Sequence, residues 1–158
     1  MNIDDFASNI PAFVLEEFFD GRLRGWGVTL GRLGGFQNRF SIEAEGQWDE
    51  AANTLALREF YTFDDGHVDA LVWTIIKRSP TSYEGRETHI NGLATGEQKG
   101  NAFHWTYTRD VPGKDGSAST FGFNDWFWLH EPGRMTAHAS LTKLAVEVAT
   151  LNVFYQKL

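Results

Sequence analysis

Hydrophobic and polar residues alternate along much of the chain, with the period of two that is typical of a β-strand with one face in water. The alternation is clearest between residues 39 and 48, where the apolar or small positions are Phe40, Ile42, Ala44, Gly46 and Trp48. Further strand-length segments, rich in β-branched and aromatic residues, span 22–30, 54–63, 67–77, 82–89, 101–109, 117–130, 134–143 and 146–156. We therefore expect about nine or ten strands.

Turn signals separate these segments at short intervals. They are Asp20-Gly21, Gly34-Gly35, Asp65-Gly66, Asn91-Gly92, Gly113-Lys114-Asp115-Gly116 and Pro132-Gly133. Connections this short leave no room for the helical crossovers of a parallel sheet, so the strands should form an antiparallel meander. We expect an all-β fold, an antiparallel up-and-down, lipocalin-like barrel, because closure leaves no strand edge exposed. An open sandwich is the structural alternative.

A helical pattern occurs only at the start of the chain. Ile3, Phe6 and Ile10 fall on one side of a helix, and Pro11 would end it. We expect residues 1–12 to form a short helix or an irregular segment, which would act as a lid or plug. The length of 158 residues predicts a single domain, 1–158, with this segment attached to the barrel.

Composition and charge exclude several classes of protein. Hydrophobic residues make up 42% and charged residues 22% of the chain, which is typical of a globular protein. The formal net charge of −7 disfavours nucleic acid as a partner, because the phosphate backbone attracts basic surfaces. The chain has no cysteine, which excludes disulfide bonds and thiolate metal sites.

Motifs for metals, cofactors and membrane targeting are not found. The five histidines are scattered over separate segments without paired spacing, so we expect no metal site. The glycines on either side of Trp26 do not match a nucleotide-binding motif, and we expect no cofactor. The chain opens on a mixed, acidic stretch instead of a signal peptide, which predicts a cytoplasmic protein. No apolar run approaches the roughly 18 residues of a transmembrane helix.

The predicted turn at Asp65-Gly66 determines the surroundings of the Glu59 carboxyl. If this dipeptide forms a two-residue turn, Glu59 faces Val72 across the strand pair and lies among apolar neighbours. A carboxyl in such a place either forms an ion pair or has a raised pKa, and raised carboxyls are candidate acids or ligand anchors. The ion pair would be with Arg39 or Arg58.

A second hairpin follows if Lys114-Asp115 is a tight turn. Trp105 then faces Asn124, and His104 faces Asp125. The latter pair would be a structural hydrogen bond or a general-base dyad, and slipping the turn by one residue would exchange all these pairings. Both faces of this hairpin carry bulky apolar groups. Either the N-terminal segment or a second subunit of a homodimer covers the outer face, or aromatic side chains line the interior around a ligand.

The order of landmarks along the chain resembles an uncharacterised bacterial family, the domain-of-unknown-function family 3833. The resemblance rests on the stretch 11–21, Gly25-Trp26-Gly27, Arg39-Phe40, Gly46, Trp48, Leu57, Glu59, Phe60, Asp65-Gly66, Trp73, the stretch 96–102 ending in Gly100-Asn101-Ala102, Trp105, Tyr107, Asp125-Trp126 and Lys143. The chain departs from the family where Leu71-Val72 replaces an expected arginine before Trp73, and where Leu144-Ala145 replaces a Phe-Gly-like pair.

The resemblance implies a role in lipid metabolism. Members of the family often carry a lipoprotein leader and tend to be encoded near enzymes that modify fatty-acyl chains. The glycine-tryptophan motif at Trp26 is also similar to the lipocalins, in which the tryptophan plugs one end of the barrel.

These observations predict a barrel that binds a hydrophobic small molecule, such as a fatty-acyl chain or another lipid, in an aromatic-lined interior. Aromatic residues make up 15% of the chain, which fits such a cavity but also fits a barrel filled by its own side chains. Our candidate ligand-binding residues are Glu59, Asn101, Trp105, Asn124, Asp125, Trp126 and Lys143.

Three alternatives stay open at this point. Lys143 would pair either with a carboxylate head group or with Asp125 or Glu59. The protein would be an acid–base enzyme, isomerase or hydratase-like, if Glu59 or Asp125 worked with His104 on the lipid. It would be a non-catalytic accessory subunit of a lipid-modifying enzyme if the barrel interior held no ligand.

Overall fold

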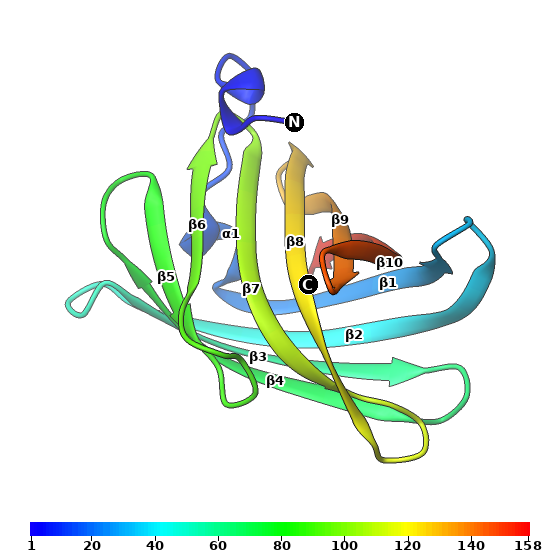
Figure 1. Ribbon diagram of the computed structural model, residues 1–158. Helices are drawn as coiled ribbons and strands as arrows, with labels where there is room; N and C mark the ends of the chain where they lie inside the picture. The colour runs from blue at the N-terminus through cyan, green and yellow to red at the C-terminus, as the bar shows by residue number, and fades with distance from the viewer.

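The computed structural model describes residues 1–158 and forms a closed antiparallel barrel (Figure 1). Its ten strands are β1 (Gly21–Gly31), β2 (Phe36–Asp49), β3 (Thr54–Phe63), β4 (Val68–Lys77), β5 (Ser82–Arg86), β6 (Ala94–Lys99), β7 (Ala102–Pro112), β8 (Ala118–Glu131), β9 (Arg134–Lys143) and β10 (Val146–Lys157). Each strand pairs with its neighbours in sequence, and β1 pairs with β10. The predicted up-and-down, lipocalin-like barrel is therefore confirmed, and the open sandwich is wrong.

Most strands lie where the alternation predicts them, and β3 and β9 have the predicted bounds. β5 is shorter than the predicted segment 82–89, and β6 was not predicted. The sequence of β6 is Ala-Thr-Gly-Glu-Gln-Lys, in which only Ala94 and Gln98 are buried. With so few apolar side chains, this segment shows no clear alternation in the sequence. It forms a strand because β5 and β7 pair with it on either side.

The hairpin turns set registers that differ from the predicted ones. Gly66 and Gly116 both have positive φ and each lengthens its turn, so that Phe63 bonds to His67 and Gly113 bonds to Ser117. The extra residue shifts each pairing by one position, as a slipped register must. Glu59 therefore pairs with Leu71 instead of Val72.

In the β7–β8 hairpin the same shift exchanges the two faces. Trp105 pairs with Asp125, and His104 pairs with Trp126. The predicted pairings of Trp105 with Asn124 and of His104 with Asp125 are wrong.

The N-terminal segment covers the outside of the barrel wall. A short 3-10 helix, η1 (Ile3–Phe6), begins at a capping box formed by Asn2 and Asp5. Ile3 and Phe6 pack against Trp126 and Trp128 on the outer face of β8, and the rings of Phe6 and Trp126 are 5.6 Å apart. The structure thus accounts for the second apolar face of the β7–β8 hairpin. The helix ends earlier than expected, and Ile10 is 87% exposed.

A second short helix, α1 (Leu15–Phe19), was not predicted and plugs one end of the barrel (Figure 1). Leu15, Phe18 and Phe19 are buried in the main hydrophobic cluster, and Phe13 stacks on Phe103 inside the barrel. Five residues are too few for a recognisable helical period, which is why the alternation pattern gave no sign of α1. None of the helices is both long and apolar enough to cross a membrane.

Polar contacts hold the plug in place. The side chain of Gln98 accepts a hydrogen bond from the Leu15 amide at 3.0 Å. The Glu16 carboxylate bonds to the Lys77 ammonium and to the Tyr83 hydroxyl. Although burial raises the pKa of Glu16, these two hydrogen bonds, a backbone hydrogen bond and the charge of Lys77 together leave the pKa below its ordinary value.

An acidic cavity lined by aromatic side chains

A cavity of about 520 Å³ occupies the barrel interior between the plug and the opposite end. Of its 34 lining residues, 22 are hydrophobic. Leu15 and Phe19 of the plug close one end, and the side chains of the β1–β2, β3–β4 and β7–β8 hairpins line the other. Pockets that bind small molecules have volumes of roughly 300–1,000 Å³ and mostly apolar walls. The cavity therefore has the size and lining of a ligand site.

The end opposite the plug, which we call the mouth, carries polar side chains. Gln37, Asn38, Asp65, His67 and Lys114 line it. The His67 ring stacks on a neighbouring phenylalanine and bonds to Asp65. Charges at the mouth thus have both signs.

Glu59 projects from β3 into the cavity without an ionic partner. Its Oε1 accepts a hydrogen bond from the Trp73 indole at 3.1 Å, and no salt bridge involves it. Burial raises its pKa to about 7. The predicted ion pair with Arg39 or Arg58 is wrong, because both arginines are exposed on the outside of the barrel.

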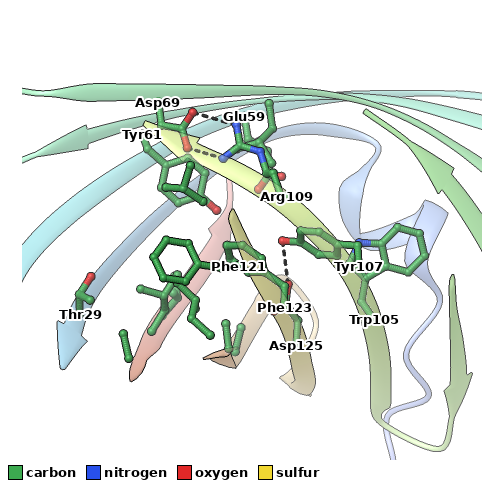
Figure 2. A pocket seen from close by; sticks show the side chains of 18 of the residues that line it. Thr29, Glu59, Tyr61, Asp69, Trp105, Tyr107, Arg109, Phe121, Phe123 and Asp125 are labelled. Atoms are coloured by element: carbon green, nitrogen blue, oxygen red, sulfur yellow. Dashed lines mark hydrogen bonds and ion pairs between the residues drawn. The ribbon is translucent and has the colours of Figure 1, made fainter. Parts of the chain in front are cut away.

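Asp125 projects into the same cavity from β8. It is 7% exposed, and the Tyr107 hydroxyl donates a hydrogen bond to its Oδ2 at 3.2 Å (Figure 2). Its Oδ1 is buried and has no hydrogen-bond partner. Burial, with a smaller contribution from the charge of Glu59, raises the pKa of Asp125 to about 8 although the Tyr107 hydrogen bond lowers it. Asp125 therefore keeps its proton at neutral pH in the empty cavity.

Aromatic side chains surround the two carboxyls. Trp73 packs edge-on against Trp105 and Tyr107, with ring centroids 5.6 and 5.1 Å away. Tyr61 and Tyr155 add their hydroxyls, and burial raises the pKa of both well above 10, so they stay protonated. Trp73, Trp105, Tyr107, Tyr61 and Tyr155 line the cavity with Glu59 and Asp125, and we call these five side chains the ring of aromatic side chains.

Two glycines leave the space that the Trp105 ring occupies in the cavity wall. A Cβ at Gly85 would lie 2.6 Å from this ring, and one at Gly96 would lie 2.5 Å from it. The hairpin of β5 and β6 therefore needs glycine at both positions to admit the indole.

Arg109 is the one basic side chain deep in the cavity wall, and its donors are already used. It is 2% exposed and forms a bidentate ion pair with Asp69, in which its two terminal nitrogens donate to the two carboxylate oxygens at 2.6 and 2.9 Å (Figure 2). Its Nε donates to Glu87 at 3.1 Å, and a terminal nitrogen also donates to the Ala70 carbonyl. This network joins β4 to β7 beyond the short β5, and it leaves little of the guanidinium for a ligand.

Over residues 1–157 the chain matches the family described as Protein of unknown function (DUF3833). The chain belongs to this family. No curated protein matches it.

The fold of this DUF3833 protein is similar to two solved structures. One is a protein of unknown function from the DUF3598 family of Nostoc punctiforme PCC 73102, with a TM-score of 0.62, 16% identity, and coverage of 94% of this chain and 51% of that chain. The other is the S-type phycobiliprotein lyase CPES from Guillardia theta, with a TM-score of 0.61, 9% identity and 90% of each chain covered. The chain thus spans about half the length of the DUF3598 protein. At these identities the likeness shows the fold alone.

The structure of the DUF3833 chain separates the seven candidate ligand-binding residues into two groups. Glu59, Trp105 and Asp125 line the cavity together. Asn101, Asn124, Trp126 and Lys143 do not.

The expectation that Asn124 and Trp126 face a ligand is wrong because of the register shift. Asn124 is exposed on the outer wall and bonds to His104, and Trp126 lies under η1. His104 thus faces away from Asp125, which excludes the predicted dyad between them.

Asn101 and Lys143 also lie outside the cavity. Asn101 donates a hydrogen bond to the Leu129 carbonyl and accepts one from Asn9, so it fastens the N-terminal segment. Lys143 is exposed with its ammonium over the Phe121 ring, and it pairs with neither Asp125 nor Glu59.

Several motif residues of the DUF3833 family hold the N-terminal segment instead of a ligand. A Cβ at Gly46 would lie 1.8 Å from the Phe19 carbonyl oxygen, and one at Gly100 would lie 1.7 Å from that of Phe6. Trp26 stacks on Phe154 on the outside and is 44% exposed. Trp26 therefore does not plug the barrel as the lipocalin resemblance implies; the plug is α1.

Sequence reasoning missed Tyr107, Arg109 and Asp69 as members of the site. A signal was present on β7, where Trp105, Tyr107 and Arg109 alternate and therefore share a face. Asp69 faces Tyr61 across the strand pair, two positions from Leu71. The wrong register hid this connection.

Proposed function

We propose that the barrel binds an apolar small molecule, such as a fatty-acyl chain or another lipid, inside the cavity. The observation that carries the proposal is the cavity of about 520 Å³ with mostly apolar walls. The accessory-subunit alternative expects a barrel filled by its own side chains, so the cavity favours ligand binding. A ligand that buries roughly 300 Å² of apolar surface gains about 7 kcal/mol before the entropy of association is subtracted.

The distribution of polar groups supports one orientation of the ligand. The cluster of Phe123, Ala139, Leu141 and Ala149 lines the wall away from the plug, with Phe121 and Leu151 packed against it. Glu59 pairs with Leu71 of the main core, and Asp125 pairs with Ala139 of this cluster on one side and with Trp105 of the main core on the other, so the two carboxyls lie where the clusters meet. The apolar part of the ligand would therefore lie towards the mouth, with its polar end deep in the barrel.

Native mass spectrometry of the freshly purified full chain, compared with its denatured mass, tests this proposal. We expect a stoichiometric small molecule, or uptake of one equivalent of added decanol by the empty protein. Ala139→Phe places a ring in the cavity without removing a polar group, and should abolish uptake. Ala56→Phe, on an exposed position of β3, is the matched control and should bind as the wild type does. No bound or added ligand in the wild type would overturn the proposal.

A second candidate function is acid–base catalysis on such a ligand. The observation in its favour is that Glu59 and Asp125, with pKa values of about 7 and 8, face one cavity. Since His104 faces outward, the chemistry would use the two carboxyls alone. Turnover of an unsaturated acyl probe that is lost in Glu59→Gln, while the variant still binds the probe, would favour an isomerase or hydratase. Binding without any turnover in the wild type would favour a carrier.

A further inference from the structure

We propose that the polar end of the ligand is a cation, a protonated or quaternary amine on an apolar chain, bound between Glu59 and Asp125 inside the ring of aromatic side chains. This inference rests on the proposed function, because it assumes that the cavity holds a ligand. It departs from the expectation of a fatty acid, whose carboxylate would need a basic partner.

The charges inside the barrel favour a cation. Asp69 and Glu87 share the single guanidinium of Arg109, so this network carries more negative than positive charge. Glu59 and Asp125 add two carboxyls that have no ionic partner and that become negative when they lose their protons. A cation would supply the charge that this wall lacks, and the deprotonated carboxylates would replace part of its lost hydration.

The Asp125 carboxyl has a buried oxygen that no group of the chain compensates. Tyr107 satisfies Oδ2, and nothing in the chain satisfies the buried Oδ1. Buried polar atoms without a partner are rare in native proteins, because each costs about 1–3 kcal/mol. Because this oxygen has almost no accessible surface, a protonated or quaternary amine in the cavity would compensate it by its charge.

The ring of aromatic side chains is suited to the same ligand. Trp73, Trp105 and Tyr107 present π-faces and edges beside the carboxyls. An ammonium group over such faces gains about 0.5–2 kcal/mol, more as it is desolvated. Aromatic side chains combined with carboxylates are a general means of binding quaternary ammonium groups.

A carboxylate has no comparable partner in the cavity. Arg109 already bonds to two carboxylates, and Lys143 lies outside. The other basic groups of the lining, His67 and Lys114, are at the mouth, and His67 is bonded to Asp65. A fatty-acid head group placed deep in the barrel would face carboxyls and pay its desolvation cost without compensation.

Cation binding should depend on pH because the two carboxyls must lose their protons. Tyr61, Tyr107 and Tyr155 face them as well, but burial keeps these hydroxyls protonated. A cation with a fixed charge does not titrate, so its affinity reports the protein groups alone. For each proton that must be released, affinity falls about tenfold per pH unit below the pKa.

Three probes with the same chain and different head groups test the inference. Decyltrimethylammonium, decanol and decanoate, kept below their micelle concentrations, are titrated into the full chain by calorimetry at pH 6.0, 7.0 and 8.5. We expect the ammonium probe to bind at least about tenfold tighter than decanoate at pH 8.5, and about tenfold or more weaker at pH 6.0. Decanol affinity should change little between these pH values.

Variants separate the carboxyls from the cavity itself. Glu59→Gln and Asp125→Asn should each lower the affinity for the ammonium probe about tenfold and leave decanol binding in place. Glu43→Gln, which removes an exposed carboxylate from the outer face of β2, is the control and should match the wild type. Circular dichroism checks the fold of each variant, and the pH series on the wild type needs no variant.

The outcomes distinguish the two proposals. Decanoate binding as tightly as the ammonium probe at pH 8.5, or ammonium binding that ignores pH and both substitutions, would overturn the cation inference while the cavity remains a ligand site. Failure of all three probes to bind would overturn the proposed function together with the inference.

Discussion

Glu59 and Asp125 lie inside the barrel without an ionic partner, Asp125 buried and Glu59 partly buried, and this shapes both stability and function. Glu59 receives a hydrogen bond from Trp73, and Asp125 receives one from Tyr107. One hydrogen bond each does not offset burial, so the neutral forms are favoured and both pKa values rise. Arg109 is the opposite case, since its ion pairs with Asp69 and Glu87 satisfy a buried charge within the wall.

Stability should fall as pH rises from about 5 to about 8.5. Between its ordinary pKa of 4.5 and its raised pKa of about 7, Glu59 binds more proton in the folded than in the unfolded chain. Its contribution to the free energy of unfolding, about 3 kcal/mol at most, is therefore lost progressively over this range. The contribution of Asp125 is lost in the same way up to about pH 8. Urea unfolding of the ligand-free protein at pH 5, 7 and 8.5 measures this loss of stability.

Glu59→Gln removes the part of this titration that belongs to Glu59 and should make the pH profile less steep, while the contribution of Asp125 remains. Glu43→Gln on the outer face should keep the wild-type slope. Parallel profiles for Glu59→Gln and the wild type would show that Glu59 titrates normally in the folded protein.

At the scale of elements, the plug and the hairpin turns decide what the cavity contains. α1 is too short to be stable alone and is held by burial of Leu15, Phe18 and Phe19 and by the Glu16 contacts. The hairpin turns choose which face of β7 and β8 points inward. Strand positions were predictable from alternation, but the register depended on whether Gly66 and Gly116 belong to the turn.

Gly46→Ala should loosen the plug. The added methyl group would lie 1.8 Å from the Phe19 carbonyl oxygen, so α1 or β2 must shift. Overpacking of this kind costs about 1–3 kcal/mol, which urea unfolding would detect together with a change in near-ultraviolet circular dichroism. Gly35→Ala is the control, because a Cβ there has no atom within 4 Å. Equal stability of both variants would show that the plug moves freely away from β2.

At the scale of the whole molecule, barrel closure encloses a cavity that the chain does not fill. Pairing of β1 with β10 removes the free edges of the sheet, and the plug closes one end. The remaining space leaves lining side chains with unused packing contacts, so a ligand should stabilise the barrel as a whole.

A bound ligand should therefore raise the melting temperature. At a free concentration of 100 times the dissociation constant, a ligand adds about 2.7 kcal/mol to the free energy of unfolding. For a chain of this length that corresponds to roughly 5–10 °C in a differential scanning calorimetry experiment. Ala139→Phe should lose this increment and Ala56→Phe should keep it. An unchanged melting temperature with a ligand that titrates onto the wild type would place the ligand outside the folded core.

The sequence by itself determined the fold class, nearly all strand positions and the family, and it singled out Glu59, Trp105 and Asp125, which line the cavity. It could do so because alternation depends on neighbouring residues and because a carboxyl on an apolar face stands out locally. The tertiary structure decided the register, the plug, the outward position of Asn124, Trp126 and Lys143, and the pairing of Arg109 with Asp69. These depend on turn conformation and on contacts between distant strands. One additional residue in a turn shifts the register and moves side chains from the inner to the outer face of the barrel.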